Sequence, residues 1–105
     1  MRILGIDPGY AIVGYGIVDF FSARYSFVNS GAIFTAQKEM LAERLEKIFD
    51  EVSGLIDFYK PEVAAVESLY FQNNQKTAIK VAEARGVVLL ALKKKGVPIY
   101  EYTPL

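Results

Sequence analysis

The feature that most constrains the fold is one amphipathic stretch, residues 38–59, which stands between two strand-like segments. Its apolar residues recur at three- and four-residue spacing, as on the buried face of a helix: Leu41, Leu45, Ile48, Phe49, Val52, Leu55, Ile56 and Tyr59. Thr35 is the expected N-cap, and Pro61 ends the helix. Strands are predicted before it (residues 24–34) and after it (residues 62–67). This order predicts a right-handed crossover, which places the later strand parallel to the first strand of the chain and beside it.

The remaining segments complete a mixed α/β sheet. Residues 3–6 and 12–18 are apolar runs around an Asp-Pro-Gly stop, and they predict an antiparallel hairpin. Residues 76–95 predict a second helix, whose apolar run at 87–92 is expected to be buried on more than one side. Residues 97–102 predict a last strand. The element order is therefore three strands, a helix, a strand, a helix and a strand, with a five-stranded sheet flanked by helices.

Composition limits the chemistry. The chain has no cysteine and no histidine, so any metal ion must be bound by oxygen ligands, which favours Mg²⁺ or Mn²⁺ over Zn²⁺. Neither a signal peptide nor a membrane span is predicted, and we expect a cytoplasmic location. The net charge is zero, but residues 69–100 hold six basic residues and one acidic residue. Such a stretch is typical of a nucleic-acid-binding flank or of a solvated helix face.

Two carboxylates end two of the predicted strands. Asp7 ends the first strand and Glu67 ends the strand at 62–67. If these strands are parallel neighbours, about 4.8 Å apart, both side chains emerge at the same carboxyl edge of the sheet. Taken singly, each acid has a structural interpretation, an Asx-turn for Asp7 and a solvated strand end for Glu67. Together they predict a site for a divalent cation, because two close carboxylates repel unless they share a cation or a proton.

The segment after Glu67 combines aromatic and amide side chains. Tyr70 and Phe71 are followed by the polar run Gln-Asn-Asn-Gln and by Lys76, a poor composition for burying both rings. An exposed ring beside a metal site can stack on an unpaired base, and amides and a lysine can bind phosphates. The structural alternative is that one ring anchors the loop in the core.

These motifs resemble those of the RuvC-type Holliday-junction resolvases. The similar segments are GIDPG with GYGIVD, VESLYFQNNQKTAIKVAEARGVV, and the closing VPIYEYTP, in the order of that family and from end to end of the chain. The stretch from Val66 to Val88 is the specific part. The resemblance implies an RNase H-like fold, a homodimer, and magnesium-dependent cleavage of two opposed strands of a four-way DNA junction in recombination and repair. Two Mg²⁺ ions per active site are expected in the intact protein, with Mn²⁺ as the alternative ion.

The resemblance also assigns roles to residues. Asp7 and Glu67 stand where the family has its first two catalytic, metal-binding acids. The residues expected to contact DNA are Tyr70, Phe71, Asn73, Asn74, Lys76 and Lys80. The second helix implies a dimer interface that contains Ala82, Gly86, Leu89 and Leu90. The branch-migration complex of RuvA and RuvB is a further implied partner.

The chain departs from the family in length. Family members carry a further helix after the last strand, with the remaining metal-binding acids and several basic residues. We therefore interpret residues 1–105 as a single RNase H-like domain that is truncated at its C-terminus and lacks that helix. The expectation is that this piece alone is inactive or nearly so.

Three other functions fit parts of the sequence. An ATP-binding domain of the actin and sugar-kinase type shares the strand, the Gly-Ile-Asp-x-Gly turn and the glycine-bearing hairpin, but it needs two large lobes. A ribosomal-RNA-processing nuclease of the same fold shares the opening motif, although the Glu-Ser-Leu-Tyr-Phe loop argues against it. The third is a non-catalytic dimerisation or DNA-binding module that retains the fold.

Overall fold

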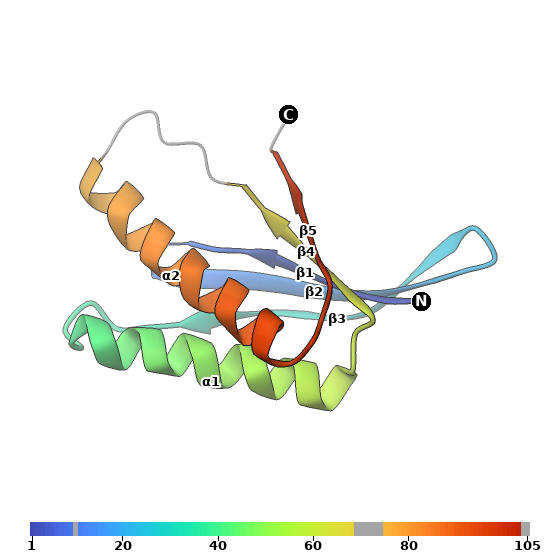
Figure 1. Cartoon of the computed structure of the whole chain (residues 1–105), viewed down its shortest axis with the longest axis horizontal. Helices are drawn as coiled ribbons and strands as arrows, with labels where there is room; N and C mark the ends of the chain where they lie inside the picture. Colours follow the sequence, from blue (N-terminus) through green and yellow to red (C-terminus); the bar gives the residue numbers. More distant parts are fainter. Residues whose placement is uncertain (10, 69–74, 104–105) are drawn as a thin grey trace.

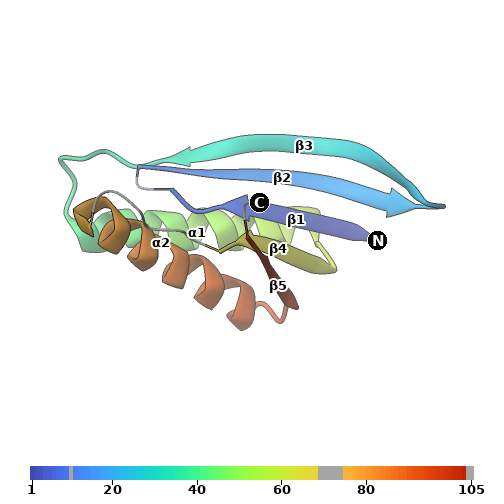
Figure 2. The same cartoon turned by 90° about the horizontal axis from the view of Figure 1, so that it is seen from above.

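The computed structural model describes residues 1–9, 11–68 and 75–103 and contains one five-stranded sheet with two helices (Figure 1). The elements are β1 (Arg2–Asp7), β2 (Ile12–Phe21), β3 (Arg24–Phe34), α1 (Leu41–Tyr59), β4 (Val63–Glu67), α2 (Gln75–Lys94) and β5 (Ile99–Tyr102). The strand order is β3-β2-β1-β4-β5 (Figure 2). The first three strands are antiparallel neighbours, and β4 lies parallel to both β1 and β5. The predicted element order and the adjacency of β1 and β4 are both confirmed.

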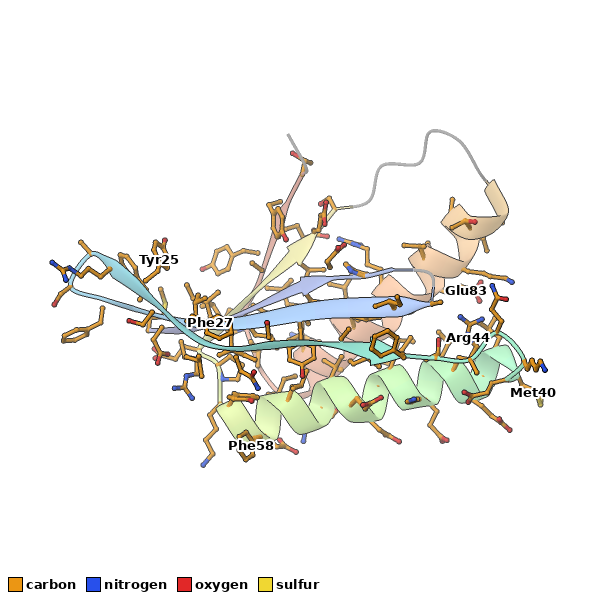
Figure 3. The ribbon with its side chains drawn as sticks, turned by 180° about the vertical axis from the view of Figure 1, so that it is seen from behind. Tyr25, Phe27, Met40, Arg44, Phe58 and Glu83 are labelled. Atoms are coloured by element: carbon orange, nitrogen blue, oxygen red, sulfur yellow. The ribbon has the colours of Figure 1, made fainter. Side chains whose placement is uncertain are left out.

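The core lies between the sheet and the two helices, which pack together on one face of the sheet (Figure 3). Leu4 is at its centre, opposite Ile17 on one neighbouring strand and Ala64 on the other, and all three are buried. α1 contributes Val52 and α2 contributes Leu92, again fully buried. Each such aliphatic side chain stabilises the fold by about 1.5–3 kcal/mol relative to an exposed position. This packing fixes the carboxyl ends of β1 and β4 relative to each other.

The start of α1 differs from the prediction. The helix begins at Leu41 rather than at residue 38, and its N-cap residue, Met40, makes no side-chain capping bond. Thr35 is therefore not the cap. Its hydroxyl instead accepts a 3.0 Å hydrogen bond from Nε of Arg44, and both residues are buried. The hydroxyl of Thr35 thus accepts a hydrogen bond from the buried Arg44 side chain instead of one from the helix backbone.

This contact yields a prediction about stability. In Thr35→Val the Arg44 Nε loses its hydroxyl acceptor in a buried position, which should lower the free energy of unfolding by about 1–3 kcal/mol. Urea denaturation with an unchanged m-value measures the effect. Thr35→Ser, which retains the hydroxyl, is the matched control and should lose less. Equal losses in the two variants would show that the hydroxyl contributes nothing.

The apolar run of α2 has one buried and one exposed face in the single chain. Val88, Ala91 and Leu92 are buried against the core, whereas Leu90 is 52% exposed. Gly86 is also exposed. None of the helices in the described ranges is long and apolar enough to cross a membrane.

Candidate active site

Asp7 and Glu67 are brought together by the parallel pairing of β1 and β4. Ile6 lies opposite Val66 in the register, so the next residue of each strand is the carboxylate. Pro8 is buried directly after β1, and the chain turns away there. The side chains of Asp7 and Glu67 are hydrogen-bonded to each other. Both acids therefore lie at one edge of the sheet, as predicted.

The two carboxyl groups interact electrostatically. The hydrogen bond with Asp7 raises the pKa of Glu67 above its ordinary value, and partial burial and the Asp7 charge raise it further. A divalent cation would relieve the repulsion between the two carboxylates. Carboxylate oxygens are ligands of the kind that Mg²⁺ prefers. In the described part of the chain, no group of three or more His, Cys, Asp or Glu side chains is placed to hold a metal ion. The pair thus fits a divalent cation as an incomplete set of ligands.

Tyr102 is a third group at this edge, and it was not among the predicted site residues. It lies opposite Glu67 in the register of β4 and β5, and its carbonyl accepts a 2.6 Å hydrogen bond from the amide of Ser68. Burial raises the pKa of the Tyr102 phenol, and the charges of Glu67 and Asp7 raise it further. Tyr102 reaches this edge because it ends the last strand, β5, which pairs with β4.

Arg85 of α2 contacts the carboxyl end of β4, and no sequence pattern signals this contact. Its Nε donates a 3.4 Å hydrogen bond to the carbonyl of Glu67, and its guanidinium forms an ion pair with Glu101 of β5. The exposed Glu101 therefore pairs with an arginine of α2 instead of adding a third acid beside Asp7. The arginine ties α2, β4 and β5 together where the candidate site lies.

Comparison with known proteins decides the family. The family model "Crossover junction endodeoxyribonuclease RuvC" matches residues 3–105. The chain belongs to the RuvC family. It is 49% identical over 105 residues to the RuvC of Fusobacterium nucleatum subsp. nucleatum. The aligned region covers 100% of this chain and 55% of that relative. Across the first relatives, the chain spans between 55% and 66% of their length.

Solved structures agree with this assignment. The structure of Thermus thermophilus RuvC in complex with a Holliday-junction substrate matches with a TM-score of 0.90 and 33% identity, over 99% of this chain and 65% of that chain. The Aquifex aeolicus PPX-GPPA enzyme matches with a TM-score of 0.57 and 18% identity, over 99% of this chain and 36% of that chain. The second likeness shows a shared fold alone. The match to RuvC structures also confirms the RNase H-like fold predicted from the sequence.

The residues that the RuvC resemblance assigns to DNA lie mostly outside the described part. Tyr70, Phe71, Asn73 and Asn74 fall in the segment 69–74, which the structure does not describe. The described chain has β4 ending at Glu67 before this segment and α2 beginning at Gln75 after it. Lys76 is in the first turn of α2, and Lys80 follows on the same helix with an exposed side chain.

The residues assigned to a RuvC dimer interface lie on α2. Ala82, Gly86 and Leu90 are exposed, whereas Leu89 is partly buried against the core. Ile79, which the sequence analysis did not include, is 61% exposed. With Ile79, the exposed residues recur at three- and four-residue spacing, so they lie along one face of the helix. This exposed stripe consists of Ile79, Ala82, Gly86 and Leu90.

The raised pKa of Glu67 predicts a pH dependence. The folded chain binds more protons than the unfolded chain between the ordinary pKa of Glu67, 4.5, and its raised value. The stability of the metal-free protein should therefore fall as the pH rises through this window, and the loss is complete above the raised pKa. In Asp7→Asn the pKa of Glu67 should return toward 4.5 and this fall should disappear.

Carboxyl NMR titration and urea denaturation from acidic to neutral pH measure both effects. Adding Mg²⁺ to the unaltered chain should lower the apparent pKa of Glu67, because the cation competes with the proton. An unchanged Glu67 pKa in Asp7→Asn would show that the two acids do not interact.

Proposed function

We propose that the chain carries part of the catalytic site of a structure-specific endonuclease that resolves four-way DNA junctions in recombination and repair. The reaction is metal-dependent hydrolysis of phosphodiester bonds. The observation that carries the proposal is the hydrogen-bonded pair of Asp7 and Glu67 at the ends of two neighbouring parallel strands. The family membership supports the junction as substrate, since a T. thermophilus relative is solved in complex with a Holliday-junction substrate. The proposed location is the cytoplasm, where such a substrate would be chromosomal DNA.

Asp7 and Glu67 are the proposed metal ligands. The expected ion is Mg²⁺, with two per active site in a protein of the relatives' length, and Mn²⁺ is the alternative. When bound, such ions activate a water molecule and stabilise the leaving oxygen of the phosphodiester. The chain's own contribution is to hold the two carboxylates in register, and Arg85 supports it by binding the Glu67 carbonyl. Because the described residues bring only two carboxylates together, we expect the isolated chain to be inactive or nearly so.

DNA contact and dimerisation complete the proposal. The segment after Glu67 would stack an aromatic ring on a base at the crossover and bind phosphates through amides and lysines. The proposed DNA-contacting residues are Tyr70, Phe71, Asn73, Asn74, Lys76 and Lys80. A homodimer through the exposed stripe of α2 would present two active sites to two opposed strands. The RuvA and RuvB branch-migration complex is the proposed partner of the whole protein.

The test compares this chain with a chimaera in which the remaining residues of the F. nucleatum relative follow it. Both are incubated with a labelled four-way junction and with a linear duplex of the same sequence in Mg²⁺. We expect only the chimaera to cleave, and only the junction to be cut into nicked duplexes. Cleavage by the chain alone would contradict the incomplete site. Equal cleavage of the linear duplex would contradict the proposed substrate.

A further inference from the structure

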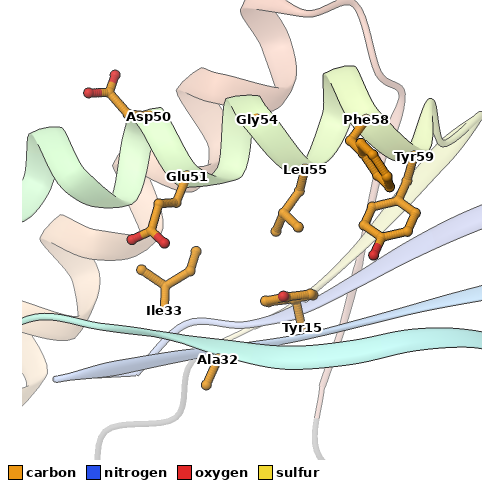
Figure 4. A pocket seen from close by; sticks show the side chains of 9 residues that line it. All are labelled: Tyr15, Ala32, Ile33, Asp50, Glu51, Gly54, Leu55, Phe58 and Tyr59. Carbon is orange, nitrogen blue, oxygen red and sulfur yellow. The ribbon is translucent and has the colours of Figure 1, made fainter.

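A groove opens at the far edge of the sheet, between α1 and the strands β2 and β3 (Figure 4). It has a volume of about 460 Å³. Tyr15 and Ile33 line it on the sheet side, and Leu55 and Phe58 line it on the helix side. None of its lining residues belongs to the candidate active site or to the exposed stripe of α2. The groove is therefore a separate surface that the proposed function does not use.

The helix side of the groove is apolar at one end and acidic at the other. Phe58 is 77% exposed, a large apolar ring left in contact with water. Asp50 and Glu51 are exposed on the preceding turns. Over α1 as a whole, the exposed charges are mostly acidic: Glu43, Glu46, Asp50, Glu51 and Asp57 against Lys47. An occupant with both apolar and basic side chains would match this surface.

A glycine keeps the middle of the groove open. Gly54 lies inside α1 between the acidic and the apolar ends, where glycine costs about 1 kcal/mol relative to alanine. A Cβ at this position would meet no described atom within 4 Å, so the packing of the protein itself does not demand glycine. The missing side chain leaves room for an occupant to approach the helix.

The strand beside the groove is an edge strand that lacks proline and charge. β3 is at the end of the sheet, so one side of its backbone has no strand partner. Residues 25–34 contain neither proline nor any charged residue, two of the usual means of blocking an edge strand. A β-bulge interrupts the pairing of β3 at Val28, but residues 29–34, which run beside the groove, pair regularly with β2. Tyr25 and Phe27 are more than two-thirds exposed along this strand, at 71% and 72% (Figure 3). Such an edge can accept an additional strand from another chain.

We propose that β3 and this groove bind an extended segment of a protein partner in which every second residue faces α1, and these residues are apolar and basic in turn. Its backbone would pair with the free edge of β3, an apolar side chain would enter the groove against Leu55 and Phe58, and a basic side chain would meet Asp50 and Glu51. The acidic face disfavours DNA, whose phosphates carry the same charge sign. It also disfavours a second copy of this chain, because two such faces would repel.

The test measures the binding of three short fluorescent peptides to the chain by anisotropy. The first peptide carries Val and Lys in turn at every second position, with Thr between them. The second has Glu in place of Lys, and the third is the first with a central Pro, which removes a backbone donor. We expect the first peptide to bind about tenfold more tightly than either of the others. Equal binding of the first and second peptides would overturn the charge match, and equal binding of the first and third would overturn strand pairing.

Variants of the chain locate the binding surface. Gly54→Leu fills the groove and Glu51→Lys reverses its charge, so each should weaken binding of the Val-Lys peptide about tenfold. Ala42→Leu introduces the same leucine side chain at an exposed position of α1 outside the groove, and it should bind as the unaltered chain does. Unchanged binding in Gly54→Leu would overturn the proposal. Two other results would also overturn the proposal. These are self-association of the chain, or its binding to a DNA oligonucleotide, if Gly54→Leu abolishes it.

Discussion

Replacing Asp7 by Asn in the chimaera should reduce junction cleavage in Mg²⁺ by at least about a hundredfold, because metal-ion stabilisation of the transition state amounts to several kcal/mol. The substitution preserves the shape of the side chain but removes the charge that the cation needs. It also removes the hydrogen bond with the Asp7 carboxyl and the Asp7 charge, both of which raise the pKa of Glu67, so the metal-free variant should be no less stable than the unaltered protein at neutral pH. Loss of activity without loss of stability is the expected signature.

The matched control is Asp19→Asn, which removes an equal charge on β2, opposite Arg2 at the start of β1. Asp19 accepts hydrogen bonds of 2.9 and 3.1 Å from Arg2, an exposed to half-buried ion pair that has no connection with the carboxylate pair. This variant should cleave junctions at a rate close to that of the unaltered chimaera and should lose only a little stability. Glu67→Gln should resemble Asp7→Asn. Full activity in either Asp7→Asn or Glu67→Gln would show that the pair is not catalytic.

The sequence predicted the parts of the site that depend on strand order. Periodicity identified α1 and the strands around it, and the crossover rule then placed β4 beside β1. From that placement the proximity of Asp7 and Glu67 followed directly, because both end their strands. Long periodic elements carry enough information for this step, since a one-residue change of register would turn buried side chains to the solvent.

Contacts between distant elements could not be predicted in the same way. Thr35 fits the N-cap pattern, yet the buried Arg44 takes its hydroxyl, and nothing local in the sequence signals that exchange. Arg85 is similar, because its contacts with Glu67 and Glu101 join three elements. The hairpin of β2 and β3 also continues further than residue 18, through a turn at Ser22 and Ala23 with φ of 51° and 61°. Such turns favour Asn and Gly, so Ser-Ala gave no turn signal.

Two leucines of α2, two residues apart, should respond to substitution in opposite ways. Leu90 is 52% exposed on the stripe proposed for dimerisation, whereas Leu92 is fully buried at 0%. Leu90→Lys places a charge in the proposed apolar interface, and we expect it to raise the dimer dissociation constant by at least about thirtyfold, the size of an interface hot spot. Its free energy of unfolding as a monomer should change little, because the side chain already contacts water.

Leu92→Ala should instead lower the free energy of unfolding by about 2–5 kcal/mol, through lost burial and the cavity that remains in the core. Sedimentation velocity and urea denaturation, carried out on both variants in the chain and in the chimaera, separate the two effects. A Leu90→Lys protein that still sediments as a dimer would exclude this face of α2 as the interface. A Leu90→Lys protein that unfolds as readily as Leu92→Ala would mean that the stripe belongs to the core of the monomer, and the two active sites would then have to be paired through another surface.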